Sequence, residues 1–255
     1  MKFILSPAKS LNIEKQTVIT ESSSISFPDK TEKIMKKLKK LSAKQIGELM
    51  KVSANISDLN FDRFQNFSTE FTKDNSKQAM LAFDGPAYKA LDTLSFDKKD
   101  VDFAQENLRI LSGLYGVLKP LDLIQPYRLE MSTRIAISAN EKNLYEVWKE
   151  TSTAKMNEAL DGSVLVNLAS NEYFKSIDTK KLKGDLLTIG FKDFKSNLCF
   201  GNKGIIAFVR FTSKNSLSFL FLQFWYKTNP RKNTGSANKA YNISGFSNLY
   251  ITPKI

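Results

Sequence analysis

Residues 111–131 have the sequence LSGLYGVLKPLDLIQPYRLEM, and this stretch guides the interpretation of the whole chain. Its two glycines, Gly113 and Gly116, permit positive φ angles or a close approach of the backbone to its neighbours. Polar side chains stand between apolar ones, so we expect several of them to converge at one place. A tightly packed turn with internal salt bridges is the alternative. The stretch contains no Walker pattern and no GxGxxG, which excludes a P-loop and a Rossmann fingerprint here.

Short strands and amphipathic helices are predicted on both sides of this stretch. Apolar residues at Ile34, Leu38 and Leu41 recur at helical spacing, and Ser42 with Gln45 forms a capping-box pattern at the start of a second helix. One mixed α/β domain over residues 1–255 accounts for this order of elements. Helices are predicted at 29–41, 42–50, 61–67 (after a turn at 57–58), 103–118 (with a glycine-containing turn) and 144–160, and strands at 2–5, 164–166, 186–194 and 204–211.

Composition narrows the classes of function. The chain has 255 residues with 38 Lys and Arg against 26 Asp and Glu, a net charge of +12. This surplus favours nucleic acid as a partner, then an acidic membrane surface, unless the lysines serve solubility alone. With no histidine and only Cys199, the chain has no Ser-His-Asp triad, imidazole metal ligand, CxxC pair or internal disulfide. Cys199 is expected to be a small core residue.

No apolar run is long enough to cross a bilayer, and the most apolar one, residues 217–226, includes Ser218 and Gln223. The N-terminal apolar patch is too short for the core of a signal peptide. We therefore expect a cytoplasmic protein without a membrane partner, and we expect no bound cofactor or metal.

Lysines cover the outer face of the helix predicted at 29–41 and continue to Lys51. Such a surface, followed by a turn and a second helix, can present ammonium groups and helix amides to phosphates. A solvated helix face is the alternative. Two further polar clusters follow predicted strands, Ser6-Pro7-Ala8-Lys9 and the segment 167–174. Strand ends are where sites form in α/β folds, and we expect Lys9 to meet a phosphate or a carboxylate such as Glu130 or Glu172.

Three blocks carry a resemblance to a known family. Ser6-Pro-Ala-Lys9, residues 105–131 and Asn167-Leu-Ala-Ser-Asn-Glu-Tyr-Phe-Lys175 resemble the signature blocks of the YaaA family, over about residues 1–210. The resemblance implies a compact α/β domain of the type called the cantaloupe fold, with a helix-hairpin-helix-like element. It also implies a role in the response to peroxide, where members limit unincorporated iron and oxidative DNA damage. Members have a basic cleft that binds duplex and branched DNA without sequence specificity.

By position, the helix-hairpin-helix-like element corresponds to residues 42–67. The hairpin expected at 53–58 lacks the glycine pair whose amides hold a phosphate. Residues 211–255 depart from the family pattern, with Lys214 where relatives have an arginine. The residues expected to contact DNA phosphates are Lys9, Lys36, Lys37, Lys40, Lys44, Lys51, Lys119, Arg128 and Lys214. The residues expected to form a motif pocket are Ser6, Gly113, Gly116, Asp122, Tyr127, Asn167, Ser170 and Tyr173.

Three functions remain after the sequence is considered. The leading hypothesis is a DNA-binding stress protein that works by electrostatic contacts rather than by catalysis. The second is an enzyme that acts on a nucleobase or small ligand by carboxylate acid–base chemistry, with Ser112, Tyr115, Glu130 and Glu172 as candidate catalytic residues. The third is iron sequestration by carboxylate oxygens, although the sequence shows no spaced carboxylate cluster.

Overall fold

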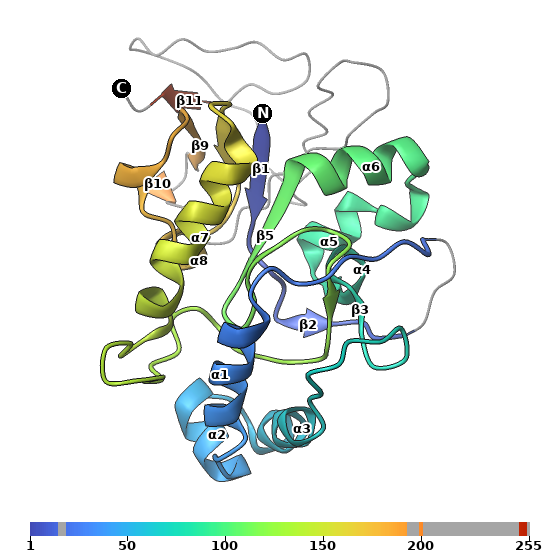
Figure 1. Cartoon of the computed structure of the whole chain (residues 1–255), viewed down its shortest axis with the longest axis vertical. Coiled ribbons are helices and arrows are strands. Elements are labelled where there is room, and N and C mark those ends of the chain that lie inside the picture. Colours follow the sequence, from blue (N-terminus) through green and yellow to red (C-terminus); the bar gives the residue numbers. More distant parts are fainter. Residues whose placement is uncertain (15–18, 193–198, 201–249, 254–255) are drawn as a thin grey trace, which may run out of the picture.

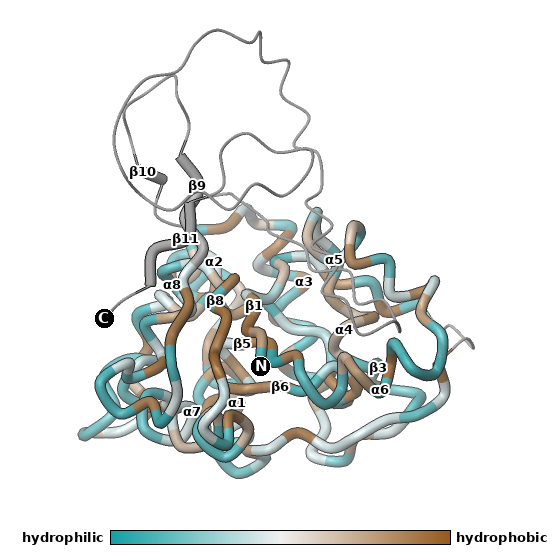
Figure 2. The backbone as a smooth tube through the Cα atoms, turned by 90° about the horizontal axis from the view of Figure 1, so that it is seen from above, coloured by the Kyte–Doolittle hydropathy of each residue, from teal (hydrophilic) through white to brown (hydrophobic). Residues whose placement is uncertain are grey.

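Four parallel strands form the centre of the computed structural model, which describes residues 1–14, 19–192, 199–200 and 250–253 (Figure 1). β1 (Lys2–Leu5) pairs in parallel with β5 (Leu108–Ser112) on one side and with β8 (Leu165–Asn167) on the other, and β8 pairs in parallel with β9 (Leu186–Lys192). Every residue of β1, β5 and β8 is buried, as expected for parallel strands covered on both faces. Figure 2 shows that hydrophobic residues predominate along β8, β1 and β6 in the interior.

Antiparallel strands flank this parallel core. β6 (Gly116–Leu118) forms a hairpin with β5, and β10 (Cys199–Phe200) and β11 (Tyr250–Pro253) both pair with β9. In the described part of the chain the sheet therefore has the order β10-β9-β8-β1-β5-β6, with β11 beside β9. Two smaller sheets pair β2 (Ser10–Leu11) with β4 (Phe83–Asp84) and β3 (Lys77–Gln78) with β7 (Leu123–Ile124).

The strand order creates a switch point between β1 and β8. The chain leaves β1 toward β5 on one side, returns across β1 to β8, and then continues away from β1 to β9. In open α/β sheets, ligands bind outside the carboxyl ends of the strands at such a reversal. Ser6, Ser112 and Asn167 lie at these carboxyl ends. The topology thus marks one edge of the sheet as a candidate site.

Helices surround the sheet. Figures 1 and 2 both place α6 (Lys98–Asn107) and α7 (Leu144–Leu160) on opposite sides of β1. Trp148 of α7 is fully buried, and its indole Nε1–H donates to the Gly113 carbonyl oxygen at 2.9 Å. The part of the chain that the structure describes also contains α1 (Pro28–Leu38), α2 (Ala43–Met50), α3 (Ala54–Gln65), α4 (Ala79–Ala82), α5 (Pro86–Leu91), α8 (Asn171–Phe174) and the 3₁₀ turns η1 (Thr93–Ser95) and η2 (Thr179–Lys181).

The two glycines of the 111–131 stretch have the roles that the sequence predicts. Gly116 has φ of +74°, and a Cβ added there would lie 2.6 Å from the Trp148 ring. A Cβ at Gly113 would lie 2.4 Å from the Leu129 carbonyl oxygen. Both positions therefore require glycine, because an added methyl group collides with atoms that are fixed by the core.

Helices α2 and α3 form a hairpin that Figure 1 shows at the end of the molecule opposite the N-terminus. Ser42 caps α2, with the predicted capping box to Gln45. The helix ends at Lys51, which adopts the left-handed conformation at φ of 55°. Close packing of the two helices is seen at Gly47, where an added Cβ would lie 2.6 Å from the Ser57 hydroxyl oxygen.

Several predicted elements are confirmed, including the strand at 2–5, the capping box and the helix at 144–160. The prediction of a turn at 57–58 is wrong, because these residues belong to α3, which begins at Ala54. The connection between α2 and α3 is instead formed by residues 51–53. The helix at 103–118 is wrong in its second half. The chain leaves α6 at Asn107 and enters strand β5, since a short apolar run fits a buried strand as well as a helix.

Some predictions lie outside the described residues. These are the strand at 204–211, the apolar run 217–226, Lys214 and most of the divergent segment 211–255. Cys199 begins β10, but its side chain is not among those described.

Candidate functional site

Serine hydroxyls connect the carboxyl ends of β1 and β8 at the switch point. The Ser170 backbone N–H donates to the Ser6 hydroxyl at 2.8 Å, and the Ser6 hydroxyl donates to that of Ser170 at 3.2 Å. The Tyr88 hydroxyl of α5 donates to the Ser6 carbonyl oxygen at 2.8 Å. Three separate segments are therefore joined at this edge.

Three buried tyrosines converge beside these serines. Tyr88, Tyr127 and Tyr173 are 5%, 4% and 8% exposed. Burial raises the pKa of each phenol, and the proximity of Tyr127 and Tyr173 raises the pKa of Tyr88 further. All three phenols are therefore neutral at physiological pH and can act as hydrogen-bond donors. The Tyr127 hydroxyl lies 2.6 Å from the Ser112 hydroxyl at the end of β5.

Charged side chains border the hydroxyl groups. The Glu130 carboxylate oxygen Oε1 lies 3.0 Å from Lys9 Nζ and 3.0 Å from Arg128 Nη2. The partner predicted for Lys9 is thus observed to be a carboxylate, and it is Glu130. The Glu172 oxygen Oε1 accepts from the Ser132 backbone N–H at 3.1 Å and from its hydroxyl at 2.7 Å. We call these residues together the carboxyl-edge cluster: Ser6, Lys9, Tyr88, Ser112, Tyr127, Arg128, Glu130, Ser170, Glu172 and Tyr173.

Asn167 of the predicted pocket and the candidate catalytic residues Ser112 and Tyr115 hold the local structure. The Tyr115 hydroxyl is enclosed, donating to the Gln125 carbonyl oxygen at 3.2 Å and accepting from the Gln125 N–H at 3.0 Å. Asn167 accepts from the Ala169 N–H through its side-chain oxygen at 3.0 Å. The Ser112 hydroxyl accepts from the Leu114 and Tyr115 amides. Tyr115 is therefore fully occupied and is not available to a ligand.

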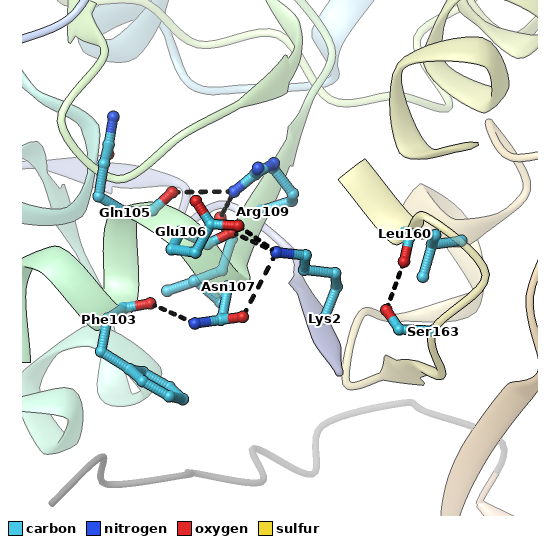
Figure 3. Close-up of polar contacts among 9 residues, drawn as sticks. Lys2, Phe103, Gln105, Glu106, Asn107, Arg109, Leu160 and Ser163 are labelled. Carbon is cyan, nitrogen blue, oxygen red and sulfur yellow. Dashed lines mark hydrogen bonds and ion pairs between the residues drawn. The ribbon is translucent and has the colours of Figure 1, made fainter. Parts of the chain in front are cut away.

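Lys119 and Asp122 lie at the opposite, amino end of the parallel strands. Lys119 lines a cavity of about 530 Å³ together with Lys2 and Arg109. Figure 3 shows Lys2 pointing toward Glu106 and Asn107, and its ammonium lies 2.5 Å from the Glu106 carboxylate. The buried Asp122 carboxylate accepts from the Ser23 hydroxyl and the Lys119 N–H, and burial raises its pKa. The structure does not bring these two residues to Ser6.

The donors of this amino-edge cavity are largely satisfied by the protein. Arg109 Nη1 donates to the backbone oxygens of Gln105 and Leu108 at 3.0 and 2.7 Å (Figure 3). Burial lowers the pKa of Arg109, and the charges of Glu106 and Asp122 oppose this effect. The cavity thus contains an internal ion cluster, and we place the candidate site at the carboxyl edge.

The predicted phosphate-binding lysines of α1 and α2 fall into two groups. Lys36 forms the first group, because it pairs with Glu32 of the same helix at 2.8 Å. The neighbouring Lys39, for which no phosphate contact is predicted, donates to the backbone oxygens of Gln65 and Phe67. The second group is exposed and has no ion pair with any residue that the structure describes. It consists of Lys37, Lys40, Lys44 and Lys51, which we call the lysine surface.

Comparison with known proteins identifies the family. Residues 1–210 match the family model described as "Peroxide stress protein YaaA". The chain belongs to this family. Over 211 residues it is 47% identical to a UPF0246 protein of Ralstonia nicotianae, covering 82% of this chain and 80% of the relative. It is 42% identical over 221 residues to a UPF0246 protein of Teredinibacter turnerae, covering 86% of this chain and 84% of the relative.

Sequence reasoning missed one residue of the site in this YaaA family member. Tyr88 was not expected to contribute, yet it binds Ser6 and faces Tyr127 and Tyr173. The sequence feature that could have indicated it is Asp84-Gly85-Pro86, because proline is favoured at the first position of a helix and so predicts that α5 begins there. The side-chain direction that brings Tyr88 to Ser6 follows only from the tertiary fold.

Within 1–14, 19–192, 199–200 and 250–253, no group of three or more Cys, Asp or Glu side chains is arranged to hold a metal ion. Over the same ranges, no helix has both the length and the apolar character needed to span a membrane.

Proposed function

We propose that this YaaA family member acts in the peroxide stress response by binding DNA through its phosphate backbone, without reading the base sequence. The observation that carries the proposal is the lysine surface. Four of the six lysines between residues 36 and 51 are exposed and have no ion pair among the described residues, and Glu48 is the single acidic residue of this stretch. Their charge is therefore available to a polyanion.

The geometry of the hairpin suits phosphate contacts. Lys37 lies in the last turn of α1, Lys40 in the connection, Lys44 in the first turn of α2 and Lys51 at its end. Lysine binds phosphate as a point charge on a flexible stem, which favours affinity without base selectivity. The Gln45 amide is already bonded to the Ser42 hydroxyl, so the first-turn amides of α2 that can add donors to a phosphate are those of Ala43 and Lys44. Limitation of unincorporated iron, which the family resemblance implies, stays a prediction.

The experiment is a matched pair of fourfold lysine variants. In the first variant Lys37, Lys40, Lys44 and Lys51 are changed to Gln. In the control, four lysines that pair with carboxylates are changed to Gln: Lys33, Lys89, Lys98 and Lys155. Both variants lose the same formal charge, so a general effect of net charge lowers duplex affinity equally.

We expect the first variant to bind a duplex of random sequence at least about tenfold more weakly than the control, measured by fluorescence anisotropy at low salt. Equal affinities of the two variants would contradict a localised phosphate-binding surface.

A further inference from the structure

The carboxyl-edge cluster has more hydrogen-bond donors than the described protein uses. Ser112 and Tyr127 share one hydrogen bond, so one of their two hydroxyl hydrogens has no acceptor among the described residues. The Tyr173 hydroxyl, on a side chain that is 8% exposed, makes no hydrogen bond with any residue in the same part of the chain. The buried Arg128 Nε–H also has no hydrogen-bond partner within residues 1–14, 19–192, 199–200 and 250–253. Buried donors without acceptors are costly, and a ligand that supplies acceptors offsets that cost.

The same cluster also offers acceptors. Glu130 uses Oε1 for both Lys9 and Arg128, and Glu172 uses Oε1 for both bonds from Ser132. Within the described residues, the second carboxylate oxygen of each glutamate has no hydrogen-bond donor. A ligand that matches this arrangement must therefore carry both donor and acceptor groups.

The charges of the cluster balance. Lys9 and Arg128 contribute two positive charges, and Glu130 and Glu172 contribute two negative ones, while the three tyrosines are neutral. A balanced site gives a free phosphate or another anion little net attraction. A neutral polar ligand avoids the desolvation penalty of an added charge and still satisfies the open donors and acceptors.

The helices that carry the lysine surface lie beyond the carboxyl ends of the strands, which is also where the cluster lies. The Thr31 hydroxyl of α1 donates to the Leu114 carbonyl oxygen in the turn after β5, so α1 starts near the carboxyl edge. From Thr31, α1 rises for six more residues to Lys37, a distance along the helix axis of about 9 Å. Figure 1 shows α1, α2 and α3 beyond this edge, away from the N-terminus. A nucleic acid that binds these lysines can therefore extend toward the cluster.

We infer that the carboxyl-edge cluster binds an unpaired nucleobase of the DNA that the lysine surface holds. This inference rests on the proposed function. A base edge is neutral and carries both donors and acceptors, which is the complement that the open groups of Tyr127, Tyr173, Glu130 and Glu172 require. The step is recognition of a base that has left the stack, and no covalent bond changes.

The test uses two duplexes that differ in one base only. The first contains a single bulged nucleotide, and in the second that nucleotide is abasic, so both carry the same phosphates. We expect the bulged-base duplex to bind about tenfold more tightly, and Tyr173→Phe and Glu130→Gln to remove this preference. Lys119→Gln, at the amino-edge cavity, is the control and should retain it. Thermal unfolding of each variant verifies that it is folded.

The results of this experiment test base recognition by the cluster separately from phosphate binding by the lysine surface. Equal affinity of the wild-type protein for the two duplexes overturns base recognition, even if binding still depends on the lysines. A preference that survives both Tyr173→Phe and Glu130→Gln also overturns it, because the base then binds elsewhere. A base preference that is lost in these variants, together with binding that is insensitive to the fourfold lysine change, supports the cluster and refutes the lysine surface.

Discussion

The backbone N–H of Ser170 donates to the hydroxyl of Ser6 at 2.8 Å, and this bond joins segments 164 residues apart in the chain. It closes the switch point between β1 and β8, where the carboxyl-edge cluster begins. The Ser6 hydroxyl also donates to Ser170, while the Tyr88 contact uses only the Ser6 backbone. The two bonds of the Ser6 hydroxyl can therefore be removed without disturbing Tyr88.

Ser6→Ala should lower the free energy of unfolding by about 1–2 kcal/mol, because the Ser170 amide loses its acceptor in a half-buried position. Urea denaturation measures the change. Ser10→Ala is the matched control, since Ser10 is exposed and its side chain has no hydrogen bond among the described residues. If both variants unfold at the same urea concentration, the bond does not contribute to the stability of the switch point.

Substitution of Gly116 and of Gly162 by alanine should distinguish two costs to the free energy of unfolding, that of a positive φ and that of a steric collision. Their φ angles are +74° and +73°, but a Cβ at Gly162 meets nothing within 4 Å, whereas at Gly116 it meets the Trp148 ring at 2.6 Å. Gly162→Ala should destabilise the protein by about 1–2 kcal/mol through backbone conformation alone. Gly116→Ala should cost clearly more and should change the fluorescence of the protein, because the buried indole must move. Equal unfolding energies for the two variants would contradict the packing of Trp148 on Gly116.

The sequence predicted those elements whose signals are local. Ser42 and Gln45 satisfy each other's backbone groups within one turn, and the helix at 144–160 is closed by Asp161 and Gly162, both at positive φ. Such signals do not depend on the rest of the fold. They fail at Leu108–Ser112, where an apolar run is compatible with a helix or a buried strand, and only the pairing with β1 decides between them.

The part of the candidate site that depends on local sequence signals was also predictable. Lys9 follows the first strand, so a carboxylate partner such as Glu130 was a reasonable expectation, and it is observed. Lys119 and Asp122 belong to the same motif as Gly113, but the β5–β6 hairpin carries them to the amino end of the sheet. The prediction therefore assigned residues to one site because they are close in sequence, whereas the hairpin between β5 and β6 places them at opposite ends of the sheet.

The ion pair between Lys2 and Glu106 should make stability depend on acidic pH. The hydrogen bond from Lys2 lowers the pKa of the Glu106 carboxyl in the folded state. The pair therefore stabilises the protein above the ordinary pKa of glutamate, and this contribution disappears as the pH falls through the lowered value. Since the Glu106 side chain is 72% exposed, Glu106→Gln should cost less than about 1 kcal/mol at neutral pH and nothing in strong acid.

Urea denaturation of both proteins at neutral and acidic pH measures this difference. Glu150→Gln is the control, because Glu150 is exposed and makes no ion pair with a described residue. A difference between wild type and Glu106→Gln that is unchanged in strong acid would show that the carboxylate charge is not its source.

The salt dependence of DNA affinity tests how many phosphates the lysine surface contacts. Each phosphate neutralised on a duplex contributes about −0.9 to the slope of log affinity against log salt, so four contacts give a slope of about −3.6. Raising the salt from about 50 to 200 mM should then weaken binding about a hundredfold. The variant with Gln at Lys37, Lys40, Lys44 and Lys51 should have a nearly flat response, whereas the control with Gln at four paired lysines should keep most of the slope. A wild-type affinity that does not change with salt would exclude phosphate contacts as the source of binding, since counterion release is the physical basis of the proposed function.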